Sequence, residues 1–315
     1  MEKQSKIYVA GHKGLVGSAI MRLLKIKGYD NIIVRSHAEL DLTRQAEVEA
    51  FFAEEKPEYV FLAAAKVGGI GANSTYPAEF FYQNMTIALN VIDASYKSGV
   101  KKLLNLGSSC IYPRLAPQPL KEEYLLTGPL EPTNEAYAMA KISAIRMCRY
   151  YNEEYGTDFI SVMPTNLYGI GDSYDPFTSH VLPAMIRKFY DAKVNHQNVT
   201  LWGDGSPCRE FLFSEDCADA CIMLMEKYNH TDIGEFINIG SGQELTISNL
   251  AEIISLVVGF EGTISWDTSR PNGTPRKLLD TSRLRALGWS PKTELQEGIR
   301  RAYKDFLESR KETFE

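Results

Sequence analysis

The start of the chain places a glycine-rich turn between a strand-like run and a helix-like run. Residues 6–10 have the length and the β-branched and aromatic content of a buried parallel strand. Gly11, Gly14 and Gly17 follow at a regular spacing, and a helical period then continues to about Lys27. In a dinucleotide-binding turn the first glycine makes the bend, the second lets a pyrophosphate approach, and the third packs the helix closely. Glycines are common in ordinary turns, so the triplet alone leaves a plain turn open.

Strand-like and helix-like runs alternate through the first half of the sequence. Further apolar runs typical of buried strands lie at 31–34, 59–65, 102–110 with its exit loop, and 159–166. Helical runs lie at 77–97 and 135–155, and a glycine-rich loop lies at 66–73. Strands joined in this way by helices predict the α/β class with a doubly wound parallel sheet of the Rossmann type.

The residue after the second predicted strand distinguishes the two nicotinamide cofactors. A site specific for NAD places an acidic side chain there for the ribose hydroxyl, whereas this chain has Arg35. Arg35, together with Lys13 or His37, fits a ribose 2′-phosphate, which points to NADPH/NADP+. A solvated arginine at a strand end is the plainer alternative. Asp41, followed by Leu42, is a plausible N-cap of the next helix and is also placed to meet an adenine edge.

The regular pattern loosens after about Tyr168 into loops rich in glycine and proline, which suggests a second, smaller substrate lobe over the crevice. A helical run at 211–227 and an apolar run at 236–240 then resemble elements that return to the sheet. We therefore expect an NADP(H)-binding domain of residues 1–170 with 211–241, and a substrate-binding domain of residues 171–210 with 242–315.

A second motif lies inside the predicted helix 135–155. Tyr137 and Lys141 are four positions apart, so both side chains project from one face of that helix. A nearby cation favours a phenolate, and Lys141 is expected to lower the pKa of Tyr137 enough to make it a candidate acid near neutrality. Ser108 lies where ligand crevices form in α/β sheets and is able to hydrogen-bond a substrate carbonyl. Taken alone, the Tyr–Lys spacing fits an amphipathic helix equally well.

Composition disfavours several other classes of protein. The formal net charge of −6 argues against nucleic-acid and membrane-surface partners. No apolar stretch approaches a membrane span and the first residues lack a signal core, so we expect a cytoplasmic protein. Five cysteines without framework spacing fit reduced thiols, and Cys217 and Cys221 have no neighbouring His or Cys cluster, so no metal site is expected.

With the glycine triplet, Ser108 and the Tyr137–Lys141 pair in this order, the chain resembles the extended short-chain dehydrogenase/reductase family. The similarity is closest to members that epimerise a GDP-linked 4-keto-6-deoxy sugar and then reduce it. The longer stretches that carry the resemblance are Ala63–Gly69, Gly107–Pro113, Glu131–Glu135, Pro164–Gly169 and Gly273–Asp280.

The resemblance implies an oxidoreductase and epimerase whose small-molecule substrate is a nucleotide sugar, GDP-4-keto-6-deoxy-D-mannose, with NADPH as hydride donor. It implies that Tyr137 is the acid for the C4 ketone, that Lys141 contacts Tyr137 and the nicotinamide ribose, and that Ser108 contacts the reacting oxygen. Cys110 and His180 are implied as base and acid of epimerisation at C3 and C5. The residues alone favour a buried structural thiol for Cys110 and a helix-start or core histidine for His180.

Binding residues are also implied by the resemblance. The implied cofactor contacts are Gly11, His12, Lys13, Gly14, Leu15, Val16, Gly17, Arg35, His37, Asp41, Leu42, Ala64, Lys141, Pro164, Thr165, Asn166, Leu167 and His180. The implied substrate contacts are Lys188, Trp202, Arg209, Asn272 and Lys277. Two positions depart from the family: Asn272 stands where an aspartate is usual, and His37 stands where a second arginine is usual. If the strand before it stays extended, Cys110 should leave the sheet on the same side as Ser108.

Other functions within the same superfamily remain open to the sequence. A nucleotide-sugar 4-epimerase or 4,6-dehydratase would retain NAD without net redox change, but a dehydratase places an acidic pair where this chain has Ser109 and Cys110. A non-catalytic NADPH sensor commonly lacks the catalytic tyrosine, and this chain keeps Tyr137. The resemblance also implies a homodimer formed through the helices at 77–97 and 135–155.

Overall fold

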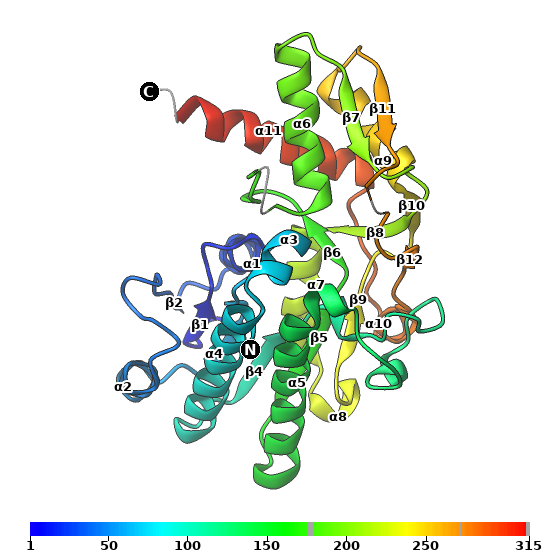
Figure 1. The fold of residues 1–315 in the computed structure, drawn as a ribbon. Coiled ribbons are helices and arrows are strands. Elements are labelled where there is room, and N and C mark those ends of the chain that lie inside the picture. The colour runs from blue at the N-terminus through cyan, green and yellow to red at the C-terminus, as the bar shows by residue number, and fades with distance from the viewer. Residues whose placement is uncertain (176–178, 271, 313–315) are drawn as a thin grey trace.

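The computed structural model describes residues 1–175, 179–270 and 272–312. Within them, six parallel strands form a central sheet in the order β2-β1-β3-β4-β5-β9 (Figure 1). The strands are β1 (Ile7–Ala10), β2 (Ile32–Ile33), β3 (Tyr59–Leu62), β4 (Lys102–Leu106), β5 (Phe159–Pro164) and β9 (Ile237–Ile239). The predicted α/β class and doubly wound parallel sheet are confirmed. Strand order reverses between β1 and β3, and ligands bind at the carboxyl ends of strands at such a point.

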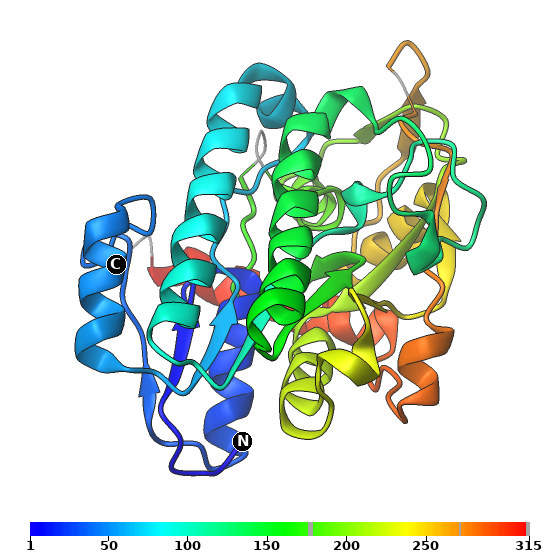
Figure 2. The ribbon, with the colours of Figure 1, turned by 90° about the horizontal axis from the view of Figure 1, so that it is seen from below.

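Helices cover both faces of the central sheet. On one face α1 (Leu15–Ile26) packs against α7 (Ser214–Lys227). On the other, α4 (Pro77–Lys97) packs against α5 (Glu135–Tyr155) and α2 (Gln45–Glu55), and α4 and α5 lie side by side in both ribbon views (Figure 2). The bounds of α4 and α5 are those that the sequence predicts. We call the sheet with these five helices the nucleotide lobe.

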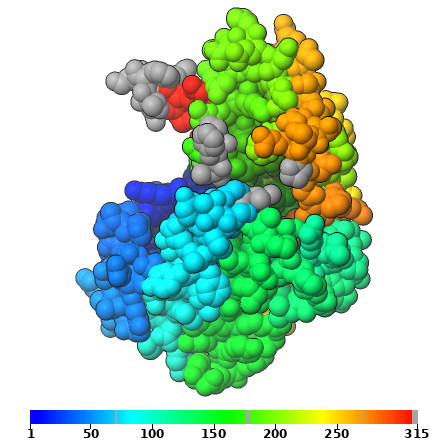
Figure 3. All heavy atoms as spheres, in the orientation of Figure 1, coloured from blue at the N-terminus to red at the C-terminus, as the bar shows by residue number. Residues whose placement is uncertain are grey.

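A second lobe lies beyond the carboxyl ends of the central strands (Figure 1). Its helices are α6 (Val181–Val194), α9 (Ile247–Val258) and α11 (Leu295–Glu312). Its strands are β6 (Asn166–Tyr168), β8 (Cys208–Phe213), β10 (Glu244–Thr246) and β12 (Arg276–Lys277) in one sheet, and β7 (Val199–Trp202) with β11 (Ile264–Asp267) in another. These elements share a separate apolar core. The surface is hollowed where the two lobes meet (Figure 3).

The structure changes several local expectations. Residues 211–213 belong to strand β8, so the helix predicted for 211–227 begins at Ser214. Asp41 is not the N-cap of α2: its carboxylate accepts hydrogen bonds from Thr43 N at 2.9 Å and Thr43 Oγ1 at 2.7 Å, and the N-cap residue is Arg44. The loop predicted at 66–73 contains the start of a short helix, α3 (Ile70–Thr75).

The end of the chain also returns to the nucleotide lobe. The short helix α10 (Ser282–Ala286) packs against β9, and Leu284 and Trp289 lie in the same core as β1 and β9. The sequence assigns 242–315 as a whole to the substrate-binding domain, whereas in the structure Leu284 and Trp289 pack in the core of the central sheet.

Candidate active site

The glycine turn after β1 leaves an open cradle at the start of α1. Gly11 has φ +86°, and a Cβ added there would lie 2.7 Å from Ala64 N, at the switch between β1 and β3. A Cβ on Gly17 would lie 2.1 Å from Gly11 O, so the helix packs directly on the turn. Gly14, the N-cap residue of α1, is exposed and makes no side-chain cap. The first amides of α1 are therefore free to bind a pyrophosphate.

A buried polar atom next to the cradle lacks a partner. His12 Nδ1 has no hydrogen-bond partner among the described residues. The side chains of Val16 and Leu42 are buried in the core, so they shape the cradle through packing. An unsatisfied ring nitrogen and an uncapped helix start are what a bound dinucleotide would complete. The residues present thus fit a dinucleotide cofactor.

Arg35 is held in place and is not freely solvated. Its Nη2 donates to Glu55 Oε1 at 2.5 Å, its Nη1 donates to Val34 O at 2.9 Å, and its guanidinium lies over the Phe51 ring at 5.4 Å. His37 and Lys13 are exposed nearby. The sequence prediction overlooked that Arg35 needs a carboxylate partner, because Glu55 lies twenty positions away on α2.

Lys141 is buried beside Tyr137, and few nearby groups balance its positive charge. Its side chain is 8 % exposed, and Nζ donates to the carbonyl of Leu106, the last residue of β4, at 2.8 Å. Nζ lies 5.7 Å from the centroid of the Tyr137 ring, whose edge meets Phe80. Burial lowers the pKa of Lys141 to about 8, and the nearby Cys110 opposes this. A cation so placed is suited to a polar ligand that hydrogen-bonds it.

Tyr137 keeps its proton at neutral pH in this structure. Burial raises its pKa well above the ordinary value, Cys110 raises it further, and a hydrogen bond with Ser108 lowers it only in part. The expectation that Lys141 brings the pKa of Tyr137 toward neutrality is therefore wrong, because desolvation of the phenolate dominates. A protonated phenol is the form that can donate to a ketone oxygen.

Ser108 and Cys110 meet Tyr137 by a route that the sequence did not predict. The chain leaves β4 and turns at once into a 3-10 helix, η1 (Ser109–Ile111), so it is not extended between the two residues. Ser108 Oγ accepts from Cys110 N at 3.4 Å and also hydrogen-bonds the Cys110 thiol and Tyr137. The turn therefore brings Cys110 back over Ser108 toward the helix that carries Tyr137.

Cations from the second lobe reach the same thiol. Lys277 in β12 is paired in register with Arg209 in β8. Burial raises the pKa of Cys110, while Lys277, Ser108 and Lys141 lower it. Burial lowers the pKa of Lys277 as well, Cys110 raises it and Arg209 lowers it. The structure thus brings Ser108, Cys110, Tyr137, Lys141, Lys277 and Arg209 together.

His180 is the N-cap residue of α6. The imidazole is accessible to solvent, yet enough protein surrounds it to lower its pKa, and the Lys277 charge lowers it further. Lys188 and Trp202 make their contacts elsewhere than with Cys110 and Tyr137. Lys188 Nζ donates to Thr200 O. Trp202 is 67 % exposed, and the Arg270 guanidinium lies over its ring. Asn272 Oδ1 accepts from Asp204 N at 2.9 Å.

Glu210 is a residue of the site that the sequence prediction missed. Its buried carboxylate accepts from Gly242 N at 2.6 Å and Leu279 N at 3.0 Å, and its carbonyl accepts from Asn166 Nδ2 at 2.8 Å. It thus ties the predicted cofactor segment Pro164–Leu167 to β8 and to the exit of β12. The signal was present as one acidic residue inside an apolar strand.

Comparison with known proteins agrees with this architecture. Residues 7–240 match the model of the NAD dependent epimerase/dehydratase family. The chain belongs to this family. It is 57 % identical over 309 residues to GDP-L-fucose synthase 1 of Arabidopsis thaliana, covering 98 % of this chain and 95 % of that protein. It is 50 % identical over 316 residues to GDP-L-fucose synthase of Escherichia coli, covering 98 % of each.

A solved relative has the same fold with a cofactor. The structure of MlghC, a GDP-mannoheptose C4 reductase of Campylobacter jejuni with NADP bound, is 40 % identical, has a TM-score of 0.90, and covers 98 % of this chain and 99 % of its own. The predicted resemblance to the extended short-chain dehydrogenase/reductase enzymes is thereby confirmed. Doubly wound folds that bind dinucleotides hold the pyrophosphate at the turn after the first strand, where this chain has its cradle.

Proposed function

We propose that the chain is a GDP-L-fucose synthase. It epimerises GDP-4-keto-6-deoxy-D-mannose at C3 and C5 and reduces the product at C4 to GDP-L-fucose. The observation that supports this most is that a thiol, a protonated phenol, a serine hydroxyl, the buried Lys141 and the half-buried Lys277 meet in one site. The names of the relatives in Arabidopsis thaliana and Escherichia coli support the same substrate.

NADPH fits the cradle at the start of α1. Gly11, Gly14 and His12 would hold the pyrophosphate, and Arg35 with His37 would hold the 2′-phosphate. The NADP in the solved reductase supports this choice of cofactor. When bound, NADPH supplies the hydride for C4. Pro164–Leu167 and Ala64 border the carboxyl ends of β5 and β3, where the nicotinamide end would lie.

Epimerisation begins with removal of the proton next to the ketone. Burial leaves the pKa of the Cys110 thiol above its ordinary value, so the base is the minor thiolate form, which Ser108 and Lys141 favour. This thiolate takes the proton and becomes a thiol, and the electrons of the C–H bond move to the C4 oxygen as an enolate. Ser108 and Tyr137 donate hydrogen bonds to that oxygen and stabilise its charge. His180 then returns a proton from the opposite side of the sugar. The substrate diphosphate neutralises Lys277, which removes one cause of the low pKa of His180 and favours its protonated form.

Reduction uses the same hydrogen bonds. Tyr137 donates its proton to the C4 oxygen as the hydride arrives, which leaves a phenolate. Lys141 lies 5.7 Å from the ring centroid and stabilises that phenolate, because the opposite charge favours its ionised form. The two chemistries therefore share one oxygen site. In epimerisation Cys110 and His180 exchange a proton on carbon, whereas in reduction the carbon receives a hydride and Tyr137 protonates the oxygen.

Incubation of the purified protein with GDP-4-keto-6-deoxy-D-mannose and NADPH tests the proposal. We expect NADPH oxidation equal to the sugar nucleotide consumed and a product identified as GDP-L-fucose by NMR. Product without net NADPH oxidation would point to a 4-epimerase or dehydratase. Tight NADPH binding with no turnover would point to a sensor.

We further propose a homodimer and a cytoplasmic location. Tyr82 on α4 and Tyr150 on α5 are 64 % and 50 % exposed, and other apolar side chains of these helices share that surface. Pairing of α4 and α5 with a second copy would bury it. Among the described residues, no helix has the length and apolar content needed to cross a membrane. A monomeric mass at micromolar concentration would contradict the dimer.

A further inference from the structure

Cationic side chains lead from the reaction centre toward the outer part of the second lobe. Lys277 is close enough to Cys110 that each alters the pKa of the other. Arg209 lies beside Lys277 across the β8–β12 pair. A Cβ added to Gly273 would lie 3.5 Å from Arg209 Nη2, so the loop that contains Gly273 begins where the cations end. A sugar at Cys110 with a diphosphate on these cations would have its base at this loop.

An exposed aromatic residue and a carboxylate lie at that place. Trp202 ends strand β7 with two thirds of its surface exposed, and Asp204, also exposed, follows two positions later. The Arg270 guanidinium lies over the Trp202 ring at 5.2 Å from its centroid. A tryptophan is rarely left so uncovered at a strand end, and aromatic faces are where nucleobases stack.

Asp204 is held as an ionised carboxylate in a fixed turn. Its Oδ1 accepts from Ser206 N at 2.9 Å and from Ser206 Oγ at 2.7 Å. These bonds lower its pKa, and a hydrogen bond with the Asn272 side chain lowers it further. Both Ser206 donors reach Oδ1, so lone pairs of Oδ2 remain for another donor.

Asn272 is hydrogen-bonded to the backbone of Asp204. Its Oδ1 accepts from Asp204 N at 2.9 Å. A Cβ added to Gly203 would lie 2.2 Å from Asn272 Oδ1, so the amide packs directly on the turn before Asp204. Asn272, which the sequence predicts to contact substrate, therefore uses its amide oxygen to hold Asp204.

We propose that Asp204 is the carboxylate that recognises the guanine base of the substrate, with the base stacked on Trp202 and Asn272 acting as the positioning residue of Asp204. This rests on the proposed function, because it takes a GDP-linked sugar as the substrate. Guanine presents a ring N–H and an exocyclic amino group side by side, and Asp204 Oδ2, the oxygen that Ser206 leaves free, accepts from the amino group. Adenine presents a ring acceptor at the same place, which a carboxylate repels.

The test is calorimetric binding of GDP, IDP and ADP, since IDP lacks only the exocyclic amino group of guanine. We expect the parent protein to bind GDP about tenfold more tightly than IDP, the value of one charge-assisted hydrogen bond, and ADP more weakly still. In Asp204→Asn, GDP binding should weaken about tenfold and the GDP-to-IDP ratio should approach one. The Kd for NADPH should stay unchanged, which shows that the variant is folded.

Asp280→Asn is the matched control. Asp280 follows Leu279 at the exit of β12, and its Oδ1 accepts from Ser282 N at 2.9 Å, as Asp204 Oδ1 accepts from Ser206 N. Its substitution should leave the GDP-to-IDP ratio unchanged. If Asp204→Asn keeps the GDP-to-IDP affinity ratio of the parent, the proposal is overturned. If Asn272→Ala loses this ratio while Asp204→Asn keeps it, the base contact belongs to Asn272.

Failure of the proposed function is distinguished by two other measurements. If UDP binds the parent as tightly as GDP, or GDP-4-keto-6-deoxy-D-mannose is not converted, the GDP-L-fucose synthase assignment fails. If the sugar is converted and GDP is preferred, but Asp204→Asn keeps the GDP-to-IDP ratio, only the role of Asp204 fails.

Discussion

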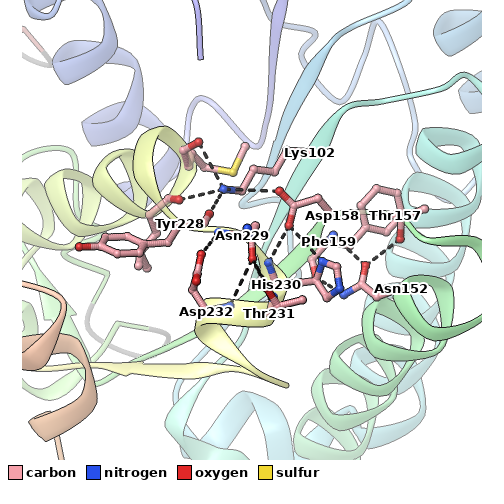
Figure 4. Close-up of polar contacts among 12 residues, drawn as sticks. Lys102, Asn152, Thr157, Asp158, Phe159, Tyr228, Asn229, His230, Thr231 and Asp232 are labelled. Carbon is pink, nitrogen blue, oxygen red and sulfur yellow. Dashed lines mark hydrogen bonds and ion pairs between the residues drawn. The ribbon is translucent and has the colours of Figure 1, made fainter.

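Lys102 and Lys141 are buried to a similar extent at opposite ends of strand β4, but they differ in the number of polar partners around their ammonium groups. Lys102, 6 % exposed, begins the strand, and its Nζ donates to the carbonyls of Leu224 at 2.9 Å and Tyr228 and lies 3.7 Å from Asp158 Oδ2 (Figure 4). Lys141, 8 % exposed, donates to Leu106 O at the other end of the strand. No carboxylate forms an ion pair with it in the part of the chain that the structure describes.

The surroundings of Lys102 form a hydrogen-bonded network that joins the start of β4 to α5, β5, α7 and the short helix α8 (His230–Ile233). Asp158 accepts from His230 N at 2.7 Å, and Asn152 Oδ1 accepts from Phe159 N at 2.9 Å and Thr157 Oγ1 at 2.7 Å (Figure 4). Lys102 also caps the carboxyl end of α7, where a cation is favoured. A buried charge with its partners supplied holds the fold, whereas one left short of partners is available to a ligand.

The largest expected effect lies at the carboxyl end of the sheet. Tyr137→Phe should lower the rate of C4 reduction about 10⁴-fold, because the variant lacks the proton that the ketone oxygen must receive. Deuterium exchange at C3 and C5 in heavy water should persist, since Cys110 is unchanged. NADPH consumption and NMR of the sugar measure the two rates. If deuterium exchange fell as much as C4 reduction in this variant, Tyr137 would not act in reduction alone, and the roles of Tyr137 and Cys110 would not be separate.

At the opposite end, Lys102→Met should lower the free energy of unfolding by about 4 kcal/mol, because Asp158 and the α7 carbonyls lose a buried partner. The kcat of the folded enzyme should be unchanged. Urea denaturation gives the first quantity and activity per folded molecule gives the second. A lowered kcat with unchanged stability would reverse the comparison of the two lysines.

Lys141→Met should stabilise the protein without cofactor. The native pKa of Lys141 is about 8 and that of an unfolded lysine is 10.5, so the unfolded state binds more protons between these values and parent stability rises with pH there. Below pH 8 the parent carries the whole free-energy cost of burying the charged Lys141, about 3 kcal/mol. The advantage of the variant should therefore shrink between pH 8 and 10.5. Denaturation at pH 7 and pH 10 measures it, and an advantage independent of pH would contradict the cause.

Cys110→Ser should slow deuterium exchange at C3 and C5 about a hundredfold, because a serine hydroxyl forms its ionised, basic form far less readily than a thiol does, even a thiol whose pKa burial has raised. NADPH affinity and the melting temperature should stay close to those of the parent. His180→Asn should impair exchange comparably. Exchange at the parent rate in Cys110→Ser would return this thiol to a structural role.

The smallest effect is expected at Arg35. Arg35→Ala should narrow the preference for NADPH over NADH about tenfold, since one charge-assisted contact with the 2′-phosphate is lost. Fluorescence titration with both cofactors measures the preference. Lys6→Ala is a matched control, because Lys6 pairs with the same Glu55 and lies outside the proposed cofactor site. Equal affinity of the parent for both cofactors would refute the assignment to NADPH.

Several elements followed directly from the sequence. The bounds of α4 and α5 and the glycine turn were predicted, because hydrophobic period and glycine placement are local properties. Tyr137 and Lys141 were placed on one face by helix geometry alone. The N-cap role of Asp41, the start of α7 and the extended path from Ser108 to Cys110 were wrong, because strand pairing and turn contacts overrode local preference there.

The chemistry of the site was decided by tertiary structure. Lys277 reaches Cys110 from a distant part of the sequence because β12 pairs with β8, and no local pattern encodes that pairing. The protonation of Tyr137 and Lys141 is set by desolvation, which depends on everything packed around them and not on their spacing. The sequence thus determined which groups stand on α5, whereas the packing of the two lobes determined their charge and their partners.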